Sequence, residues 1–246
     1  MSRPLVSVVV AVKNGEAYLR EALGSVIAQR HRPLEVIVVD GRSTDRTLEI
    51  ARSFDVVHVV EQAGIGIADA YNTGIACARG EYTAFLSSDD VWTAEKLDVQ
   101  MTFMRTHPEV RFTVGKARFL LQPGVPVPAG FRTELLEGTH TASIMETLVT
   151  HRSVWTEVGG FDTALALAHD VDWFSRARHL GVPMAVLPDV LLEKRIHGAN
   201  ASLDVARNNP ELLKVVRRSI RRQRLAVVQP PGGIAPSRAS DVRGES

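Results

Sequence analysis

Two adjacent carboxylates, Asp89 and Asp90, follow a short apolar run whose residues, 82–86, predict a buried strand. Two like charges this close together are unfavourable unless a proton or a cation relieves them. Hard divalent cations take oxygen ligands and bridge carboxylates to diphosphate oxygens, so the pair predicts a divalent-cation site. In the competing interpretation Asp90 and Thr93 cap a helix that begins near Val91, which accounts for only one of the two aspartates.

Two further candidate side chains stand at or just after the ends of predicted strands. Asp40 ends a strand at residues 34–40, where a carboxylate either accepts hydrogen bonds from a base or ribose or shapes the following turn. His197 follows a strand at residues 191–196 and precedes Gly198, so it lies in a loop and can complete a cation site. A lone histidine is more often structural than a ligand, and the residues alone leave both interpretations of Asp40 open.

Asp170 and Asp172 lie at the start of a helix predicted at residues 171–180. Residues two apart do not share a helix face. One of the two is therefore expected to point into a cleft, where a carboxylate can take a proton from a substrate hydroxyl as general base. The other is expected to cap the helix or to pair with Arg176. The residues alone do not decide which aspartate has which role.

Alternating strands and helices are expected to position these residues. Apolar runs predict the strands, and apolar residues at helical spacing predict the helices between them. The predicted order is a strand at 6–12, a helix at 16–28, a strand at 34–40, a helix at 46–53 capped by residues 43–45, a strand at 56–60, a helix at 67–79 and a strand at 82–86. This alternation predicts the α/β class, with a parallel sheet covered by helices and ligands outside the carboxyl ends of the strands.

The alternation of predicted strands and helices is less regular after Pro108. Residues 122–140 are rich in proline and glycine, which predicts a loop, close to the mouth of the site, in place of a helix or central strand. The regular elements predicted beyond it are a strand at 146–150, a helix at 152–158 stopped by Gly159-Gly160, a helix at 171–180 and strands at 184–187 and 191–196. We expect one domain over residues 1–208, a basic helix over 209–228 and a disordered tail over 229–246.

Charge is unevenly distributed along the 246 residues, although the net charge is only +1. Of 29 Lys and Arg and 28 Asp and Glu residues, nine basic and three acidic ones follow residue 204, so the part before carries five net negative charges. A net acidic domain argues against nucleic acid as a partner. The single cysteine, Cys77, cannot form an internal disulfide, and its Ala-rich surroundings predict a packed side chain. No apolar stretch reaches the roughly 18 residues of a bilayer span, and we expect a cytoplasmic protein.

The basic helix places Leu213, Val216 and Ile220 on one face with arginines around them. Two interpretations stay open. Such a helix can lie on an anionic membrane surface, at the inner face of the membrane, where a lipid-linked acceptor would be reached. It can equally pack on the domain and expose a solvated basic face, which is the interpretation we favour from the sequence.

Five segments, in order and over about residues 5 to 203, closely resemble family 2 glycosyltransferases. They are VSVVVAVKNGEAYLREALGSVIAQRHRPLEVIVVDGRSTDRT, GIADAYNTGIACARGEYTAFLSSDD, VGGFD, HDVDWFSRA and RIHGANAS. The resemblance implies a Rossmann-like A-type glycosyltransferase fold, with a mostly parallel central sheet and helices on both faces. It also implies an inverting enzyme that moves a sugar from a nucleotide-diphosphate sugar, usually a UDP-sugar, to an acceptor hydroxyl. The acceptor would be a glycan, a lipid-linked compound or a small molecule.

The resemblance also implies roles for single residues. Asp170 would be the general base, and Asp89, with Asp90 and His197, would bind Mn²⁺ or Mg²⁺ on the diphosphate. The metal stabilises the charge that grows on the leaving group. The residues expected to contact the nucleotide or donor are Ala11, Lys13, Asn14, Asp40, Asp69, Asn72 and Ser88.

The sequence departs from the family pattern at two positions. The metal motif often reads Asp-x-Asp, whereas position 87 is Ser, which predicts weaker or water-mediated coordination. His169 stands where a Glu usually precedes the base, so the sequence leaves both Asp170 and Asp172 open as the base.

Two other functions compete with a transferase. A sugar nucleotidyltransferase needs a Gly-rich loop after the first strand, and residues 11–15 lack those glycines. A non-catalytic sugar-nucleotide-binding module is supported only by Ser87, since Asp170 and His197 are both retained. The sequence Gly64-Ile65-Gly66 is a weak signal for NAD, because Asp69 replaces the third glycine of that fingerprint.

Overall fold

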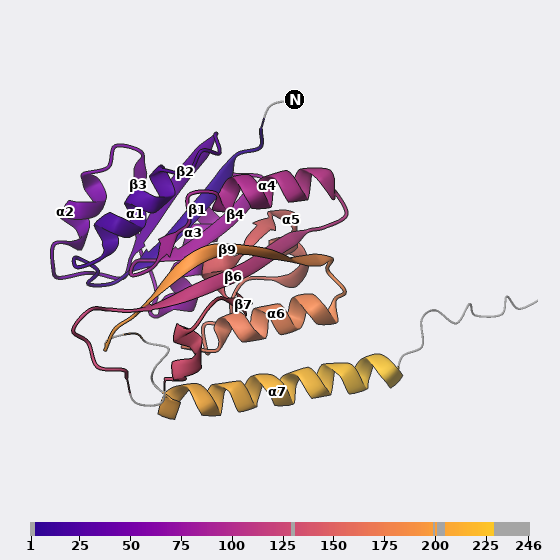
Figure 1. The fold of residues 1–246 in the computed structure, drawn as a ribbon. Helices are drawn as coiled ribbons and strands as arrows, with labels where there is room; N and C mark the ends of the chain where they lie inside the picture. The colour runs from indigo at the N-terminus through magenta and orange to yellow at the C-terminus, as the bar shows by residue number, and fades with distance from the viewer. Residues whose placement is uncertain (1–2, 129–130, 199, 201–204, 229–246) are drawn as a thin grey trace, which may run out of the picture.

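The computed structural model of the 246-residue chain describes residues 3–128, 131–198, 200 and 205–228. In this part of the chain nine strands form one sheet, and helices pack on both of its faces (Figure 1). The strands are β1 (Val6–Val12), β2 (Leu34–Asp40), β3 (Val57–Glu61), β4 (Tyr82–Ser87), β5 (Val91–Trp92), β6 (Phe112–Leu121), β7 (His140–Ala142), β8 (Val149–His151) and β9 (Met184–Ile196). Their order is β3-β2-β1-β4-β8-β6-β9-β5, with β7 paired to β6.

Most of the sheet is parallel, as predicted. β1 pairs in parallel with β2 and β4, and β2 pairs in parallel with β3. The short strand β8 is antiparallel to both β4 and β6, so β6 runs in the same direction as β4, and β9 runs parallel to β6. The carboxyl ends of β1, β2, β4 and β9 therefore meet at one edge of the sheet, where parallel α/β folds bind ligands.

Helices cover both faces of the sheet because its central strands are apolar on both sides. All seven residues of β1 are buried. Val8 and Val10 face a core with α1 (Leu19–Ile27), α2 (Thr47–Arg52) and α4 (Lys96–Thr106). Val9 faces a second core with α3 (Ile67–Cys77), α5 (Ser153–Val158) and α6 (His169–His179). Gly74 of α3 lies so close to Val9 that an added Cβ would be 2.2 Å from its Cγ1.

Three predicted elements differ from the structure. The two strands predicted at 184–187 and 191–196 are one strand, β9, with a register shift where Val114 and Lys116 of β6 face Val186 and Val190. The shift accommodates Pro188, which has no N–H for the ladder. The strand predicted at 146–150 is a 3₁₀ turn, η2 (Met145–Thr147), followed by β8. A second 3₁₀ turn, η1 (Thr133–Leu136), lies within the predicted loop.

The helix expected near Val91 begins only at Lys96, so the prediction that Asp90 and Thr93 cap it is wrong. Val91 and Trp92 form a strand because the Trp92 side chain is buried, 2% exposed, and pairs with Leu192 of β9. The Thr93 hydroxyl donates instead to the carbonyl of Val190.

The expectation of a packed Cys77 is also wrong, because this residue is exposed. The buried face of α3 is formed by Ala68, Ala70, Tyr71 and Gly74. Cys77 ends the helix and lies off that face, so the small apolar neighbours in its sequence do not enclose it.

The last helix, α7 (Val205–Val228), packs along α6 on the outside of the molecule (Figure 1). Val215 is buried against Leu165 and Ala168, and Arg222 donates to Asp172 at 3.2 Å. The boundary predicted between residues 208 and 209 falls inside this helix, and the predicted tail, 229–246, lies outside the described residues. Among the described residues no helix is long and apolar enough to cross a membrane.

Candidate active site

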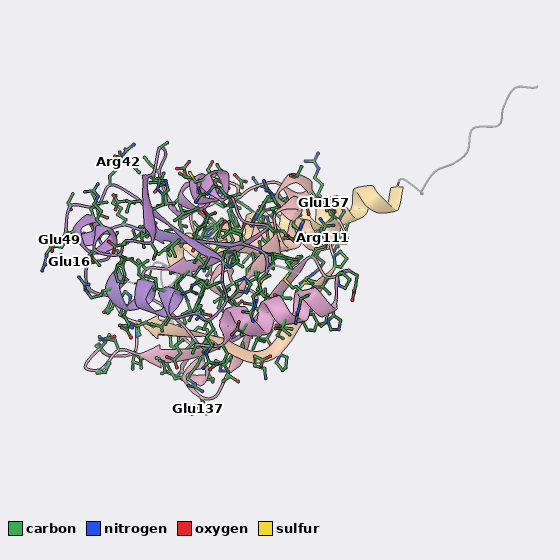
Figure 2. All side chains as sticks on the ribbon, turned by 90° about the horizontal axis from the view of Figure 1, so that it is seen from above. Glu16, Arg42, Glu49, Arg111, Glu137 and Glu157 are labelled. Carbon is green, nitrogen blue, oxygen red and sulfur yellow. The ribbon has the colours of Figure 1, made fainter. Side chains whose placement is uncertain are left out.

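Four loops meet at the carboxyl edge of the sheet, following β1, β2, β4 and β9. Figure 2 places Glu16 and Arg42, which belong to the first two loops, at one end of the molecule. Arg111 and Glu157, which precede β6 and lie in α5, are at the opposite end. The candidate residues of these loops therefore share one end of the molecule.

Asn14 joins the loop after β1 to the loop after β2. Its backbone is left-handed, with φ of 53°, and its amide N–H donates to the hydroxyl of Ser43 at 2.8 Å. Its side-chain oxygen accepts the Thr44 amide at 2.9 Å, and the Gly15 amide donates to the Thr47 hydroxyl at 2.8 Å. The structure thus gives Asn14 a loop-joining role, and a contact with the nucleotide base stays a prediction for it.

Asp40 ends β2 as a buried residue, 3% exposed. Its Oδ2 accepts the Ser43 amide at 3.0 Å, whereas its Oδ1 is buried without a hydrogen-bond partner among the described residues. A buried acceptor without a donor is destabilising by about 1–3 kcal/mol. Asp40 Oδ1 is thus an acceptor that a ligand N–H or O–H would satisfy.

Asp89 and His197 come together from loops more than one hundred residues apart. The distance from Asp89 Oδ2 to His197 Nε2 is 3.1 Å, and the Asn200 side chain donates to the same oxygen at 3.1 Å. The side chain of Asp89 is 25% exposed and that of His197 13% exposed. Tyr18 lies against the His197 ring, with 5.1 Å between the ring centres. A carboxylate and an imidazole at the molecular surface are thus available to one ion.

This pair fits a cation that is completed by a substrate. Within the described ranges no three His, Cys, Asp or Glu side chains surround a possible metal position. Magnesium and similar ions are commonly held by one or two protein ligands, with phosphate oxygens and water filling the remaining positions. The donor set of Asp89 and His197 matches that kind of site and does not match an all-protein cage.

Asp90, unlike its neighbour Asp89, is fully buried. Its Oδ2 lies 2.8 Å from the ammonium group of Lys194, and its Oδ1 accepts the Arg195 amide at 2.9 Å. Both oxygens therefore hold β9 against the end of β4. Because both oxygens already have partners in the fold, a metal contact of Asp90 stays a prediction.

Glu146 is a buried carboxylate that the sequence analysis did not assign to the site. Its Oε1 accepts the Ser87 hydroxyl at 2.5 Å and lies 3.6 Å from Lys194 Nζ. Burial opposes the charge of Lys194, but Asp90 and Glu146 outweigh it and raise the pKa of this lysine well above its usual range. Burial likewise opposes the charge of Glu146, yet Lys194 and Ser87 hold its pKa below the usual value. Lys194 is therefore the counter-charge of two buried carboxylates, Asp90 and Glu146, beneath the site.

The two candidate bases on α6 have different surroundings. Asp172 is 2% exposed and accepts from Arg176 at 2.8 Å and from Arg222 at 3.2 Å. Asp170 is half-buried and accepts the neighbouring Val171 amide at 2.7 Å. Burial raises the pKa of Asp170 to about 7, and the nearby Glu146 adds to the rise. The pairing predicted for one of the aspartates with Arg176 therefore belongs to Asp172.

His169, immediately before Asp170, is a neutral side chain in an aromatic cluster. Burial lowers its pKa to about 4, and its ring lies 5.9 Å from Tyr71 and 5.6 Å from Phe161. At neutral pH this residue therefore brings no charge to the site, unlike the Glu that the family pattern has here.

The loop before α6 is held by a residue of α7. The carboxylate of Glu211 accepts the amides of Ala166 at 3.0 Å, Leu167 at 2.8 Å and Ala168 at 3.0 Å. Because Asp170 follows two residues later, Glu211 fixes the backbone that carries it.

The remaining predicted donor-binding residues line the same edge. Ala11 is buried beneath it, Lys13 is exposed, and the Ser88 hydroxyl lies against Gly15. Asp69 accepts the Gly64 amide at 2.9 Å. The Asn72 side chain accepts the Phe161 amide at 2.8 Å and donates to the Phe161 carbonyl at 2.9 Å, which ties α3 to the loop after α5. Donor contacts of these residues stay predictions.

Comparison with known proteins agrees with this arrangement. The sequence profile of Glycosyl transferase family 2 matches residues 7–121, which include β1 to β6 and the Asp89 loop. This chain belongs to glycosyltransferase family 2.

Several bacterial proteins are similar to this family 2 member. A Mycobacterium tuberculosis protein is 30% identical over 204 residues, covering 78% of this chain and 58% of the relative. A Rickettsia typhi glycosyltransferase is 29% identical over 226 residues, covering 81% and 66%. TuaG of Bacillus subtilis, named for teichuronic acid biosynthesis, is 35% identical over 130 residues, covering 51% of each chain. The chain thus spans 58% of the length of the Mycobacterium relative and about half of TuaG.

Solved structures share the A-type fold of this family 2 member. TarS of S. aureus, residues 1–349 in complex with UDP-GlcNAc, has a TM-score of 0.69 at 21% identity, covering 88% of this chain and 66% of that one. The mannosyltransferase PcManGT of Pyrobaculum calidifontis, in complex with GDP-Man and Mn²⁺, has a TM-score of 0.68 at 23% identity, covering 90% and 65%. The predicted Rossmann-like A-type fold is therefore confirmed.

The sequence analysis of this family 2 member missed Glu146, Lys194, Tyr18 and Glu211 as parts of the site. Two of them carry a signal that could have been used. Glu146 is a lone charge in the otherwise uncharged segment SIMETLVT, and Glu211 is the one acidic residue of a basic helix. A single charge in such surroundings indicates a specific buried partner.

Proposed function

We propose that this chain is an inverting, metal-dependent transferase that moves a sugar from a nucleotide-diphosphate sugar to an acceptor hydroxyl. One observation carries the proposal. The Asp89–His197 pair and the unsatisfied Oδ1 of Asp40 follow strands that end at the same edge of the sheet, and Asp170 at the start of α6 interacts electrostatically with Glu146 and Lys194 beneath that edge. A nucleotide, a diphosphate with its cation and a reacting hydroxyl need these three kinds of group.

The donor would lie across the carboxyl ends of β1, β2 and β4. Asp40 Oδ1 would accept a hydrogen bond from the base or ribose, which removes an unsatisfied buried acceptor. Asp89 and His197 would hold Mn²⁺ or Mg²⁺ on the diphosphate, and the ion would stabilise negative charge on the leaving nucleotide.

Asp170 is the better candidate for the base. Its carboxylate forms no ion pair within 4.0 Å with a described side chain, whereas Asp172 accepts from two arginines. A carboxyl group with a pKa of about 7 is close to the best value for accepting a proton at neutral pH. Asp170 would take the proton of the acceptor hydroxyl as its oxygen attacks the anomeric carbon. The bond from that carbon to the diphosphate oxygen breaks, and its electron pair leaves with the nucleotide.

The similar solved structures support a nucleotide-sugar donor and do not identify which one. TarS is described in complex with UDP and with UDP-GlcNAc, and PcManGT with GDP-Man and Mn²⁺. We propose a UDP-sugar as donor, on the preference of the family for uridine. A glycan, a lipid-linked compound or a small molecule would be the acceptor, and the cytoplasm the compartment.

The first experiment measures nucleotide binding and turnover separately. Thermal shift with UDP should raise the melting temperature in the presence of Mn²⁺ and not with EDTA, because a ligand that binds only the folded state stabilises it. Release of UDP from a panel of UDP-sugars should require the same ion. Asp89→Ala and His197→Ala should lose both responses, while Asp55→Ala, at an exposed position on the surface, should keep them.

The main competing function is a sugar-nucleotide-binding module without activity. Its only support is Ser87, which replaces a carboxylate of the family motif. Wild-type protein that binds UDP and Mn²⁺ but releases no UDP from any donor, with or without acceptors, would favour the module over the transferase.

A further inference from the structure

The outer face of α7 combines an apolar stripe with unneutralised positive charge. Leu213, Val216 and Ile220 are 58%, 51% and 44% exposed, at spacings of three and four residues that place them on one side of the helix. An adjacent stripe at the same spacing carries Arg217, Arg221 and Arg224, with Lys214 beside it, and all four are exposed. The four basic side chains form no ion pair with any described residue.

Side chains on the inner face of the same helix contact the rest of the protein. Arg218 donates to Asp162 at 2.7 Å and Arg222 to Asp172 at 3.2 Å, while Val215 is buried under the helix. The one acidic residue of α7, Glu211, also points inward, to the loop before α6. The basic residues thus fall into two sets, and only the outward set lacks a counter-charge within the described part of the chain.

We propose that the outer face of α7 docks on the surface of an anionic phospholipid bilayer. The helix would lie in the interface, with Leu213, Val216 and Ile220 among the acyl chains and the four cations at the headgroups. Charge complementarity favours this occupant over a neutral apolar partner, because each Lys or Arg near an anionic surface adds to the attraction. Single exposed apolar residues are ordinary on proteins, but three in one stripe beside four free cations are not.

The position of α7 determines how the protein would be oriented on the bilayer. In Figure 1 the helix begins at the end of the molecule where β9 ends, and its last turns project past the opposite end. Glu211, near its start, touches the loop that precedes Asp170. Docking along α7 would therefore hold the start of α6 close to the bilayer. The consequence that a lipid-linked acceptor reaches Asp170 rests on the proposed function, whereas the docking does not.

The test is co-sedimentation of the full chain with vesicles. Vesicles of equal parts phosphatidylcholine and phosphatidylglycerol should bind the protein, vesicles of phosphatidylcholine alone should not, and high salt should weaken binding. The triple variant Arg217→Gln, Arg221→Gln, Arg224→Gln should partition roughly a hundredfold more weakly. The triple variant Leu213→Gln, Val216→Gln, Ile220→Gln should lose at least about tenfold through its apolar area.

A matched control removes the same charge elsewhere. The variant Arg30→Gln, Arg52→Gln, Arg105→Gln changes three exposed arginines on other elements and should bind anionic vesicles like the wild type. Equal loss in this control, or no sedimentation of the wild type, overturns the proposal. A dimer in light scattering that the apolar triple variant dissociates, without vesicle binding, would assign the face to a second copy instead. UDP binding with Mn²⁺ by the same preparations separates failure of this proposal from failure of the transferase function.

Discussion

The Oε1 atom of Glu146 lies 2.5 Å from the Oγ atom of Ser87, and this contact joins a 3₁₀ turn to the end of β4. Ser87 stands where family 2 members often have the first Asp of an Asp-x-Asp motif. The hydroxyl at position 87 is therefore a hydrogen-bond donor to a carboxylate that comes from elsewhere in the chain. An aspartate at position 87 would meet Glu146 as a like charge.

Ser87→Asp should therefore destabilise the protein, by about 2 kcal/mol, because a third carboxylate would join Asp90 and Glu146 beside the single cation of Lys194. A change of this size lowers the melting temperature of a chain of this length by roughly 4–8 °C. Differential scanning calorimetry would measure it. The double variant Ser87→Asp, Glu146→Gln should recover most of the loss, and a double variant no more stable than Ser87→Asp would contradict the like-charge explanation.

Lys194→Met should leave two buried acids without their cation. We expect a loss of about 3–5 kcal/mol at neutral pH, since breaking a buried ion pair leaves an uncompensated charge. Burial already raises the pKa of Asp90 to about 7, whereas Lys194 helps to hold that of Glu146 below its usual value. Without Lys194 the folded-state pKa of Asp90 rises further and that of Glu146 rises above its unfolded value. Acids with raised pKa values are most favourable to folding below the unfolded pKa and lose that contribution as pH rises. Urea unfolding of wild type and variant from pH 5 to pH 8 should therefore show that the variant loses less free energy of unfolding at low pH than at high pH. A loss that does not change with pH would contradict this account.

The rate of sugar transfer should rise with pH through about 7. Burial raises the pKa of Asp170 to about 7, and a general base must be deprotonated to accept the acceptor proton, so the active form is populated above that value. A pH profile of kcat/KM for UDP release in the presence of acceptor would measure this increase as the rising limb of the profile. Asp170→Asn should lower kcat by about 10²–10⁴-fold and remove the limb, while leaving UDP binding intact.

Asp172→Asn serves as the contrasting variant on the same helix. The loss of a carboxylate that accepts from Arg176 and Arg222 should lower stability by about 2 kcal/mol, since both arginines are partly exposed and solvent screens the loss. Its kcat at a temperature where it is folded should fall less than about tenfold. If Asp172→Asn removes the pH limb and Asp170→Asn does not, the two roles are reversed.

Glu211→Gln should weaken the link between α7 and the loop that precedes α6. A neutral amide accepts the three amides of residues 166–168 less strongly than a carboxylate does. We expect faster amide hydrogen exchange at these positions and a lower kcat at unchanged affinity for UDP. Unchanged exchange would show that the loop does not depend on the charge.

The N-terminal half of the fold is readable from the sequence because its central strands, β1 and β4, and most of β2 are buried on both faces. β1 and β2 begin and end where the apolar runs do, since no alternation of polar residues blurs them. The later half is less readable because long-range contacts decide it. Trp92 forms a strand only because Leu192 is its partner, and Pro188 lies within one strand only because the register of β9 shifts there.

The residues of the site also differ in how far the sequence predicts them. Asp89 and His197 could be named as candidates from their places at the ends of predicted strands, whereas the choice of Asp170 over Asp172 came from the family resemblance. The burial of Asp90 and the pairing of Lys194 with two acids depend on contacts between residues that lie about 50 to 100 positions apart. No local pattern carries that information, and a pair of adjacent aspartates looks the same whether one or both face the solvent.

The contact between Glu211 and the amides of residues 166–168 also sets an order of events during synthesis. The loop that precedes Asp170 leaves the ribosome about forty residues before the side chain that fastens it. A nascent chain that has finished β9 already holds the nine strands that the structure describes, yet the loop at residues 166–168 still lacks the carboxylate that fastens it. The helix α7 is thus made after the described sheet, and it fastens a loop that was made before it.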